Sequence, residues 1–347
     1  MPRLALGCCL LVLLWAKPGS ALLMAADTPL VIAHRGASGY LPEHTLPAKA
    51  MAHAMGADYL EQDVVLTRDG VPIVLHDIHL EPTTDVEQVF PGRAREDGRF
   101  YAIDFDLAEI RRLRVHERSR RTPDGREEAV FSGRFPLQPT SLQVPTLAEE
   151  IALIDGMNRS SGRRAGLYIE LKAPQFHRRA GQDIARAVLQ VLRDTGYSER
   201  TEQVYLQCFD DATLRYLRSE LQTSLPLIQL IADKAWGEDS AVDYDYLRSA
   251  AGLDEVATYA DGIGPWIMHI YLGRDATGAA RLSDLVDQAH ARNLLVHPFT
   301  LRSDHLPAGI EDLDTLHNIL LDQAGVDGAF TDFPDRMRAY IDRERAP

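Results

Sequence analysis

Two pairs of charged residues interrupt apolar segments of the sequence at a spacing of two. Glu61 and Asp63 lie in YLEQDVVL, and Glu170 and Lys172 lie in GLYIELK. Because alternate residues of a β-strand point to the same face, each pair shares one face. Buried carboxylates repel one another unless a cation neutralises them. We therefore expect Glu61, Asp63 and Glu170 to bind a hard cation such as Ca²⁺ or Mg²⁺. An internal salt-bridge cluster built on Lys172 is the alternative.

Two histidines end apolar segments of the same kind. His34 ends PLVIAH, with Arg35 directly after it, and His76 ends PIVLH. Imidazole titrates near neutral pH, so His34 and His76 are predicted to act as general acid and base. Arg35 and Lys172 can bind an anion, most simply a phosphoryl group. Beside a hard cation, this set of residues indicates hydrolysis of a phosphate ester.

These residues need a framework that brings distant segments together. Between most of the apolar segments lie helical patterns such as DIARAVLQVLRDTG. Strand and helix patterns that alternate in this way predict an α/β protein with a (β/α)8 TIM barrel, in which the carboxyl ends of the strands form the rim that carries the active site. A doubly wound sheet is the second choice, although no glycine-rich dinucleotide motif follows the first strand. The eight predicted strands are 29–34, 59–66, 166–172, 203–209, 226–232, 260–265, 294–299 and 327–332.

One long segment departs from this alternation. Residues 78–145, approximately, are rich in arginine and mixed in pattern. Because a βα connection is normally a few residues long, the segment is predicted to form a small subdomain inserted after strand 2, on the rim of the barrel. The barrel pattern resumes in a helix capped by Thr146, with Glu149 at the spacing of a capping box. Thr45 is predicted to cap an earlier helix, and Glu43 is a candidate to orient Arg35.

The first residues have the layout of a cleaved secretory signal. Arg3 precedes an apolar run from Leu4 to Ala16, and small residues follow near Ala25. This run is shorter than the roughly 20 residues of a membrane-spanning helix, so we expect export without a stable membrane anchor. Residues 1–26 are therefore assigned to the signal peptide and 27–347 to the barrel domain.

The net charge and the cysteine content indicate which partners the protein can bind and whether it can form a disulfide. The formal net charge of −14 argues against nucleic acid as a partner and is compatible with a small anionic substrate held in a local positive site. Beyond the predicted signal, Cys208 is the only cysteine, so the domain cannot form an internal disulfide. The oligomeric state is not predicted.

Seven motifs follow one another along the chain: HRGASGYLPEHT, GADYLEQDVVLTRDGVPIVLHD, IELKAP, YLQCFD, ADGIGP, VHPFT and GAFTDFPD. Because it contains these motifs in this order, the sequence resembles the glycerophosphodiester phosphodiesterase family, and within it the exported bacterial branch. The resemblance covers nearly all of residues 27–347, and the spacing of HRG, ExD and HD is its most specific part. It implies a periplasmic location.

The resemblance also implies roles for individual residues. Glu61, Asp63 and Glu170 would bind the metal, with Ca²⁺ expected before Mg²⁺, while His34 and His76 would transfer protons. Arg35 and Lys172 would bind phosphate. Trp266 would pack against the glycerol carbons, although a purely structural role is an alternative.

The implied substrates are deacylated phospholipids such as glycerophosphocholine and glycerophosphoethanolamine. The implied products are sn-glycerol 3-phosphate and an alcohol, formed either by direct attack of water or through a cyclic phosphate. We expect the insertion to cover the rim while leaving the alcohol side open, which would give broad head-group tolerance. The alternatives are a phosphatidylinositol-specific or sphingomyelinase D-like phospholipase and a surface binding protein on the same scaffold.

Overall fold

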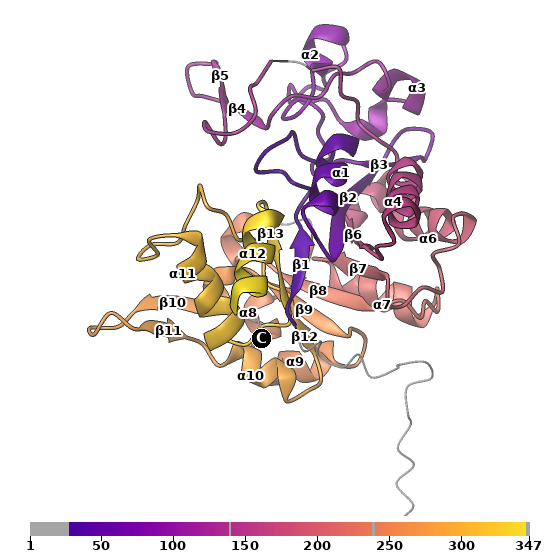
Figure 1. The fold of residues 1–347 in the computed structure, drawn as a ribbon. Coiled ribbons are helices and arrows are strands. Elements are labelled where there is room, and N and C mark those ends of the chain that lie inside the picture. Colours follow the sequence, from indigo (N-terminus) through magenta and orange to yellow (C-terminus); the bar gives the residue numbers. More distant parts are fainter. Residues whose placement is uncertain (1–27, 139, 238–239, 345–347) are drawn as a thin grey trace, which may run out of the picture.

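A computed structural model describes residues 28–138, 140–237 and 240–344. The signal peptide predicted for residues 1–26 lies outside these ranges. Parallel strands alternate with helices around a nearly closed barrel, which confirms the predicted (β/α)8 fold (Figure 1). The eight barrel strands are β1 (Leu30–Ala33), β2 (Tyr59–Leu66), β6 (Gly166–Leu171), β7 (Val204–Cys208), β8 (Leu227–Ile231), β9 (Gly262–Pro265), β12 (Leu295–Val296) and β13 (Gly328–Thr331).

The strands follow the order β12-β9-β8-β7-β6-β2-β1-β13. Backbone hydrogen bonds between the two end strands complete the barrel, since Asp327 N donates to Val296 O at 3.1 Å and Phe330 N donates to Pro298 O at 3.0 Å. Every residue of the barrel strands except Leu30 is buried, which explains why most of these strands are nearly continuous apolar segments in the sequence.

Helices surround the strands and cover their outer side (Figure 1). Thr45 caps the first of them, accepting a hydrogen bond from Ala48 N, and Thr146 forms the predicted capping box with Glu149. Both predicted caps are therefore confirmed. The helices of the barrel are α1 (Leu46–Ala54), α4 (Leu147–Ser161), α5 (Pro174–Arg179), α6 (Ile184–Asp194), α7 (Asp211–Ser219), α8 (Tyr244–Leu247), α9 (Ala250–Val256), α10 (Leu285–His290), α11 (Leu313–His317) and α12 (Pro334–Glu344).

Strand β2 continues into an antiparallel partner that the sequence did not reveal. Strand β3 (Pro72–Val74) pairs with the end of β2, with Val64 opposite Val74. The turn between them contains Gly70, whose φ of 75° is in the left-handed region that glycine tolerates best. His76 therefore follows a short hairpin strand rather than ending the second barrel strand.

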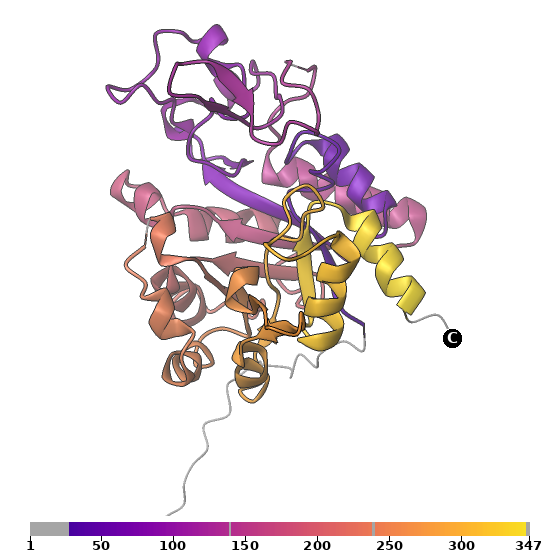
Figure 2. The same ribbon diagram turned by 90° about the vertical axis from the view of Figure 1, so that its left-hand side faces the viewer.

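The insertion forms a small unit beyond the carboxyl ends of the strands (Figures 1 and 2). It has its own hydrophobic cluster, which includes Phe100, Phe105 and Ile110 and packs against Val65 and Ile73 of the barrel. Its regular elements are short: α2 (Val86–Val89), α3 (Leu107–Ile110), β4 (Ser119–Arg121) and β5 (Glu127–Ala129). A second hairpin, β10 (Tyr271–Arg274) with β11 (Ala280–Leu282), projects from the barrel after β9.

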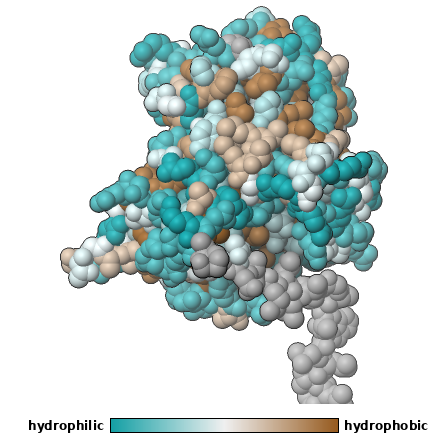
Figure 3. Space-filling model, in the orientation of Figure 1, coloured by the Kyte–Doolittle hydropathy of each residue, from teal (hydrophilic) through white to brown (hydrophobic). Residues whose placement is uncertain are grey.

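Polar residues cover most of the face seen in Figure 3, and hydrophobic residues gather in separate areas. The large hydrophobic side chains that stand exposed among the described residues are Trp236, Tyr246 and Leu272. None of the helices in the described ranges is both long and apolar enough to cross a membrane.

Candidate active site

A cavity of about 520 Å³ opens at the carboxyl ends of the barrel strands. The structure brings all of the predicted site residues to its wall, although they come from segments between residues 34 and 266. These residues are His34, Arg35, Glu61, Asp63, His76, Glu170, Lys172 and Trp266.

Three carboxylates share one side of this cavity. Glu61 and Asp63 point from β2, and Glu170 lies directly opposite Asp63 on β6. Burial, followed by the charge of Asp63, raises the pKa of Glu61 well above its usual value. Burial acts in the same direction on Asp63, but His76, Lys172 and His44 together hold the pKa of Asp63 well below its usual value. Asp63 therefore keeps its negative charge, and this charge favours a cation bound beside it.

The atoms that could ligate a metal lie close together. Single atoms of His44, Glu61 and Asp63 all lie within 4.8 Å of one another, and all three residues are buried. This group contains two of the three predicted ligands, Glu61 and Asp63. Glu170 is not part of it and forms an ion pair with Lys172, with Oε1 and Nζ 2.7 Å apart. His44 was not predicted to belong to the group, because a histidine in a loop carries no periodic signal.

Hydrogen bonds around His44 indicate what this residue does. Lys49 Nζ lies 3.3 Å from His44 Nδ1, and an ammonium can only donate, so Nδ1 accepts. The ring proton is then on Nε2, which donates to Asp63 Oδ2 at 2.8 Å. A protonated nitrogen cannot ligate a metal, so we assign His44 to orienting Asp63. The other carboxylate oxygen, Asp63 Oδ1, is buried without a hydrogen-bond partner in the described part of the chain, which fits a cation ligand.

Lys49 is itself fully buried and forms an ion pair with Glu150, with Nζ and Oε2 3.0 Å apart. Burial raises the pKa of Glu150 to about 7, with Lys49 acting against this shift.

We expect Lys49→Met to lower the free energy of unfolding by about 3–5 kcal/mol, because it leaves a buried carboxyl group unpaired. Urea denaturation at pH 8 measures this change. The double variant Lys49→Met with Glu150→Met should recover a large part of the loss. A single variant as stable as the wild type would contradict the prediction.

The loop between β1 and α1 holds two site residues in an uncommon backbone conformation. Arg35 has a φ of 57° and His44 a φ of 60°, which is the left-handed region that non-glycine residues rarely adopt. The backbone joins them, since His44 N donates to Arg35 O at 2.9 Å. Arg35 N also donates to Glu61 Oε2 at 2.6 Å. This loop therefore holds Glu61 through the backbone of Arg35 and Asp63 through the side chain of His44.

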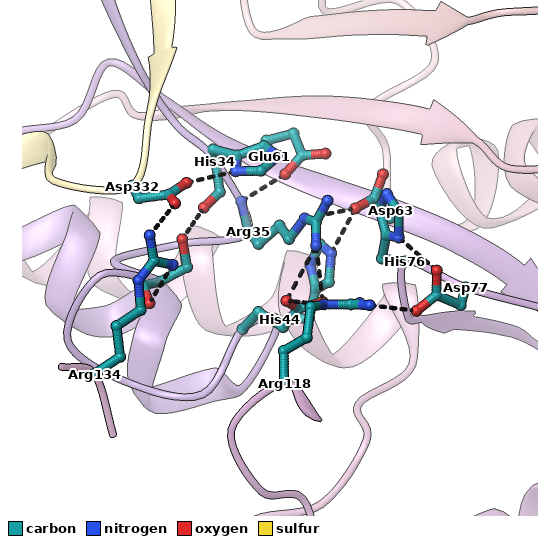
Figure 4. A network of polar contacts seen from close by, with 12 residues as sticks. His34, Arg35, His44, Glu61, Asp63, His76, Asp77, Arg118, Arg134 and Asp332 are labelled. Atoms are coloured by element: carbon teal, nitrogen blue, oxygen red, sulfur yellow. Dashed lines mark hydrogen bonds and ion pairs between the residues drawn. The ribbon is translucent and has the colours of Figure 1, made fainter. Parts of the chain in front are cut away.

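Each of the two cavity histidines has a carboxylate behind it (Figure 4). His34 Nδ1 lies 2.6 Å from Asp332 Oδ1, and His76 Nδ1 lies 2.8 Å from Asp77 Oδ1. Burial, opposed in part by these carboxylates, lowers the pKa of each histidine to about 4, so both rings are neutral near pH 7. The carboxylates accept a hydrogen bond from Nδ1–H, so Nε2 is the nitrogen of each ring that faces a substrate for proton exchange. Lys172 Nζ lies 3.4 Å from Nε2 of His76.

The insertion contributes Arg118 to this network (Figure 4). Arg118 donates to Glu43 Oε1 at 2.7 Å and to Asp77 Oδ2 at 2.6 Å, so it contacts the carboxylate that orients His76. Glu43 also pairs with Arg35 at 3.0 Å, as expected from the sequence. Arg118 therefore links the insertion to both Arg35 and His76.

A second arginine of the insertion supports the other histidine. Arg134 donates to Asp332 Oδ2 at 2.6 Å and to Asp304 Oδ2 at 2.7 Å. Burial alone would raise the pKa of Asp332, but Arg302, His34 and Arg134 hold it well below its usual value. Neither Arg118 nor Arg134 was predicted, because the many arginines of the insertion do not differ in local sequence. The density of arginine in that segment was the only available signal.

The chain matches the model of the glycerophosphoryl diester phosphodiesterase family over residues 34–336. The protein belongs to this family. The match confirms the predicted family and class of enzyme.

Two proteins named glycerophosphodiester phosphodiesterase are similar to this chain over most of their length. The chain is 42% identical to a glycerophosphodiester phosphodiesterase from Haemophilus influenzae over 88% of each sequence. It is 38% identical to a protein of the same name from Treponema pallidum, over 93% of this chain and 95% of that one. A crystal structure of a family protein from Silicibacter pomeroyi shares the fold, with a TM-score of 0.69, 27% identity, and coverage of 92% of this chain and 95% of that one.

Opposite the charged side, the cavity of this family member has an aromatic wall. Trp236 and Trp266 lie edge to face with ring centroids 5.2 Å apart, and Phe299 lies 6.1 Å from Trp236. Phe209 completes the wall and lies 5.5 Å from Lys172 Nζ. Trp236 was not predicted, because it belongs to a connection after β8 rather than to a barrel strand. The cavity thus offers one charged side and one apolar side.

Proposed function

We propose that the protein hydrolyses glycerophosphodiesters, such as glycerophosphocholine and glycerophosphoethanolamine, to sn-glycerol 3-phosphate and an alcohol with the help of a divalent cation. The observation that carries this proposal is the convergence of two carboxylate-backed histidines, three carboxylates and two cations on one cavity. Membership of the glycerophosphoryl diester phosphodiesterase family supports it.

The cation site in this proposal consists of Glu61, Asp63 and Glu170, with Ca²⁺ as the expected ion and Mg²⁺ as the alternative. The unpartnered Oδ1 of buried Asp63 fits a ligand atom, and an all-oxygen set suits a hard cation. When bound, such an ion withdraws electron density from phosphoryl oxygens and helps to fix the substrate. His44 keeps Asp63 in place.

The remaining residues bind and orient the substrate. Arg35 and Lys172 line the cavity beside the carboxylates and supply positive charge for the phosphoryl oxygens. Trp266 stands on the aromatic wall and offers a flat apolar surface to the glycerol carbons. In this proposal the phosphorus atom lies between the two histidines.

Proton transfer is assigned to His34 and His76. One Nε2 removes the proton from the attacking hydroxyl group, and the other donates a proton to the oxygen of the departing alcohol. Asp332 and Asp77 fix the two rings by accepting hydrogen bonds from Nδ1 and stabilise the charge that a ring gains.

Export to the periplasm completes the proposal, as in an exported bacterial branch of the family. Its support is the pattern of Arg3, the apolar run from Leu4 to Ala16 and the small residues near Ala25. Sequencing the amino terminus of the protein recovered from a periplasmic extract tests this part. A chain that still begins at Met1 would contradict it.

Hydrolysis itself is tested with glycerophosphocholine. The purified protein with Ca²⁺ is expected to release sn-glycerol 3-phosphate and choline in equal amounts, because in the proposal the general acid protonates the oxygen of the departing alcohol. A coupled glycerol 3-phosphate dehydrogenase assay measures the first product. Release of phosphocholine and glycerol instead would show that the other ester bond is cleaved and would overturn the proposed orientation.

A further inference from the structure

A second cavity of about 640 Å³ adjoins the catalytic one, between the insertion and residues 302–305. The two cavities share four lining residues, so they lie side by side at the rim of the barrel. The shared residues are Arg35, His76, Arg302 and His305. We call this second space the basic cavity.

Positive groups dominate the wall of the basic cavity. Its lining includes four arginines, and Asp304 is the only carboxylate among the described residues that line it. Asp304 is already paired with Arg134 at 2.7 Å. Glu43 and Asp77, which pair with two of the arginines, do not belong to the lining. The arginines of the wall are Arg35, Arg118, Arg120 and Arg302.

Arg302 is the best placed of these arginines to bind a ligand. Its Nε donates to Asp332 Oδ2 at 2.7 Å, while within the described ranges its two terminal nitrogens make no hydrogen bond to protein. Its side chain is 23% exposed, and the Phe131 ring lies 5.6 Å from its guanidinium carbon. Arg302 is therefore held at one end and presents a two-pronged donor at the other, which matches the geometry of a carboxylate.

We propose that the basic cavity receives the alcohol part of the substrate and favours alcohols that carry a carboxylate, which Arg302 binds. The inference rests on the proposed function, in which the aromatic wall takes the glycerol carbons, and it adds that the alcohol lies on the side of the basic cavity. Glycerophosphoserine is the simplest such substrate. It differs from glycerophosphoethanolamine by one carboxylate. This preference narrows the broad head-group tolerance expected from the sequence.

The test compares kcat/KM for glycerophosphoserine and glycerophosphoethanolamine. The wild-type enzyme is expected to favour glycerophosphoserine by about tenfold, the effect of one charge-assisted hydrogen bond in a partly exposed site. Arg302→Gln should bring the ratio close to one. Because Arg302 also contacts Asp332, both rates can fall in this variant, but a general loss cancels in the ratio. Arg121→Gln is the matched control, because Arg121 lines neither the catalytic cavity nor the basic cavity and pairs with Glu87.

A wild-type enzyme that favours ethanolamine or shows no preference would overturn the inference, and so would a ratio unchanged in Arg302→Gln. If that variant does not fold, the wild-type ratio measured at 0.05 M and 0.5 M salt decides, because a charge-based preference must fall as ionic strength rises. Failure to hydrolyse either substrate, or glycerophosphocholine, would instead refute the proposed function and the inference with it. Hydrolysis of both at equal rates refutes the inference alone.

Discussion

Replacing His34 with alanine is expected to lower kcat on glycerophosphocholine by about a hundredfold or more, and His76→Ala should have an effect of similar size. Positioned acid or base groups contribute on this scale, and each ring is held by a carboxylate in the orientation that proton transfer needs. KM should change little, because Arg35 and Lys172 still bind the phosphoryl group. Steady-state kinetics of both variants measure the effect.

A substrate with an activated leaving group separates the two histidines. A p-nitrophenyl glycerophosphodiester needs no proton on its leaving oxygen, so the variant that lacks the general acid should recover most of its activity on it. The variant that lacks the base should not. His290→Ala serves as the control, because His290 pairs with Asp327 at the amino ends of the strands, away from the cavity. Either histidine variant with more than half of the wild-type kcat would remove that residue from the mechanism.

Removing the cation is expected to have the second large effect. Chelation of the purified enzyme should lower kcat/KM by at least about a hundredfold, since stabilisation of developing charge by a metal ion contributes several kcal/mol and 1.36 kcal/mol corresponds to a factor of ten. Added Ca²⁺ should restore the activity, and comparison with Mg²⁺ identifies the preferred ion. The variant Asp63→Asn should lose activity to the same extent even with Ca²⁺ present, because it removes the charge of a ligand while keeping its shape.

Thermal denaturation gives a second reading that does not depend on turnover. At a hundredfold excess over its Kd, a bound ion stabilises the folded state by about 2.7 kcal/mol. Ca²⁺ should therefore raise the Tm of the wild type and of the control Asp155→Asn, whose carboxylate is partly exposed on α4 and pairs with Arg159. It should not raise the Tm of Asp63→Asn. Full activity after exhaustive chelation, with no change in Tm on adding the ion, would contradict the assigned cation site.

The barrel could be predicted from the sequence because its strands are buried on both faces. Such strands must be short, apolar and rich in β-branched residues, and all eight predicted segments contain a barrel strand. Glu61 and Asp63 stood out for the same reason, since charge inside such a segment needs an explanation. Their positions on one wall of the cavity agree with the alternation of a strand.

The residues that orient the side chains of the site could not be predicted in the same way. Arg118 and Arg134 lie in an insertion whose pattern has no regular period, and each reaches a carboxylate far away in the sequence. The roles of His44 and Lys49 depend on which ring nitrogen faces which partner, and that is a property of three-dimensional packing. Local sequence identifies the residues at the strand ends, while the residues that orient them require the assembled fold.

The contact between His34 and Asp332 joins residues 298 positions apart, and the strands that carry them, β1 and β13, are neighbours in the barrel. During synthesis, the ribosome releases His34 early and Asp332 near the end. A growing chain therefore has no oriented His34, and an incomplete chain has no closed barrel to hold it. Catalytic competence therefore requires the complete chain, with the final strand in its place beside the first.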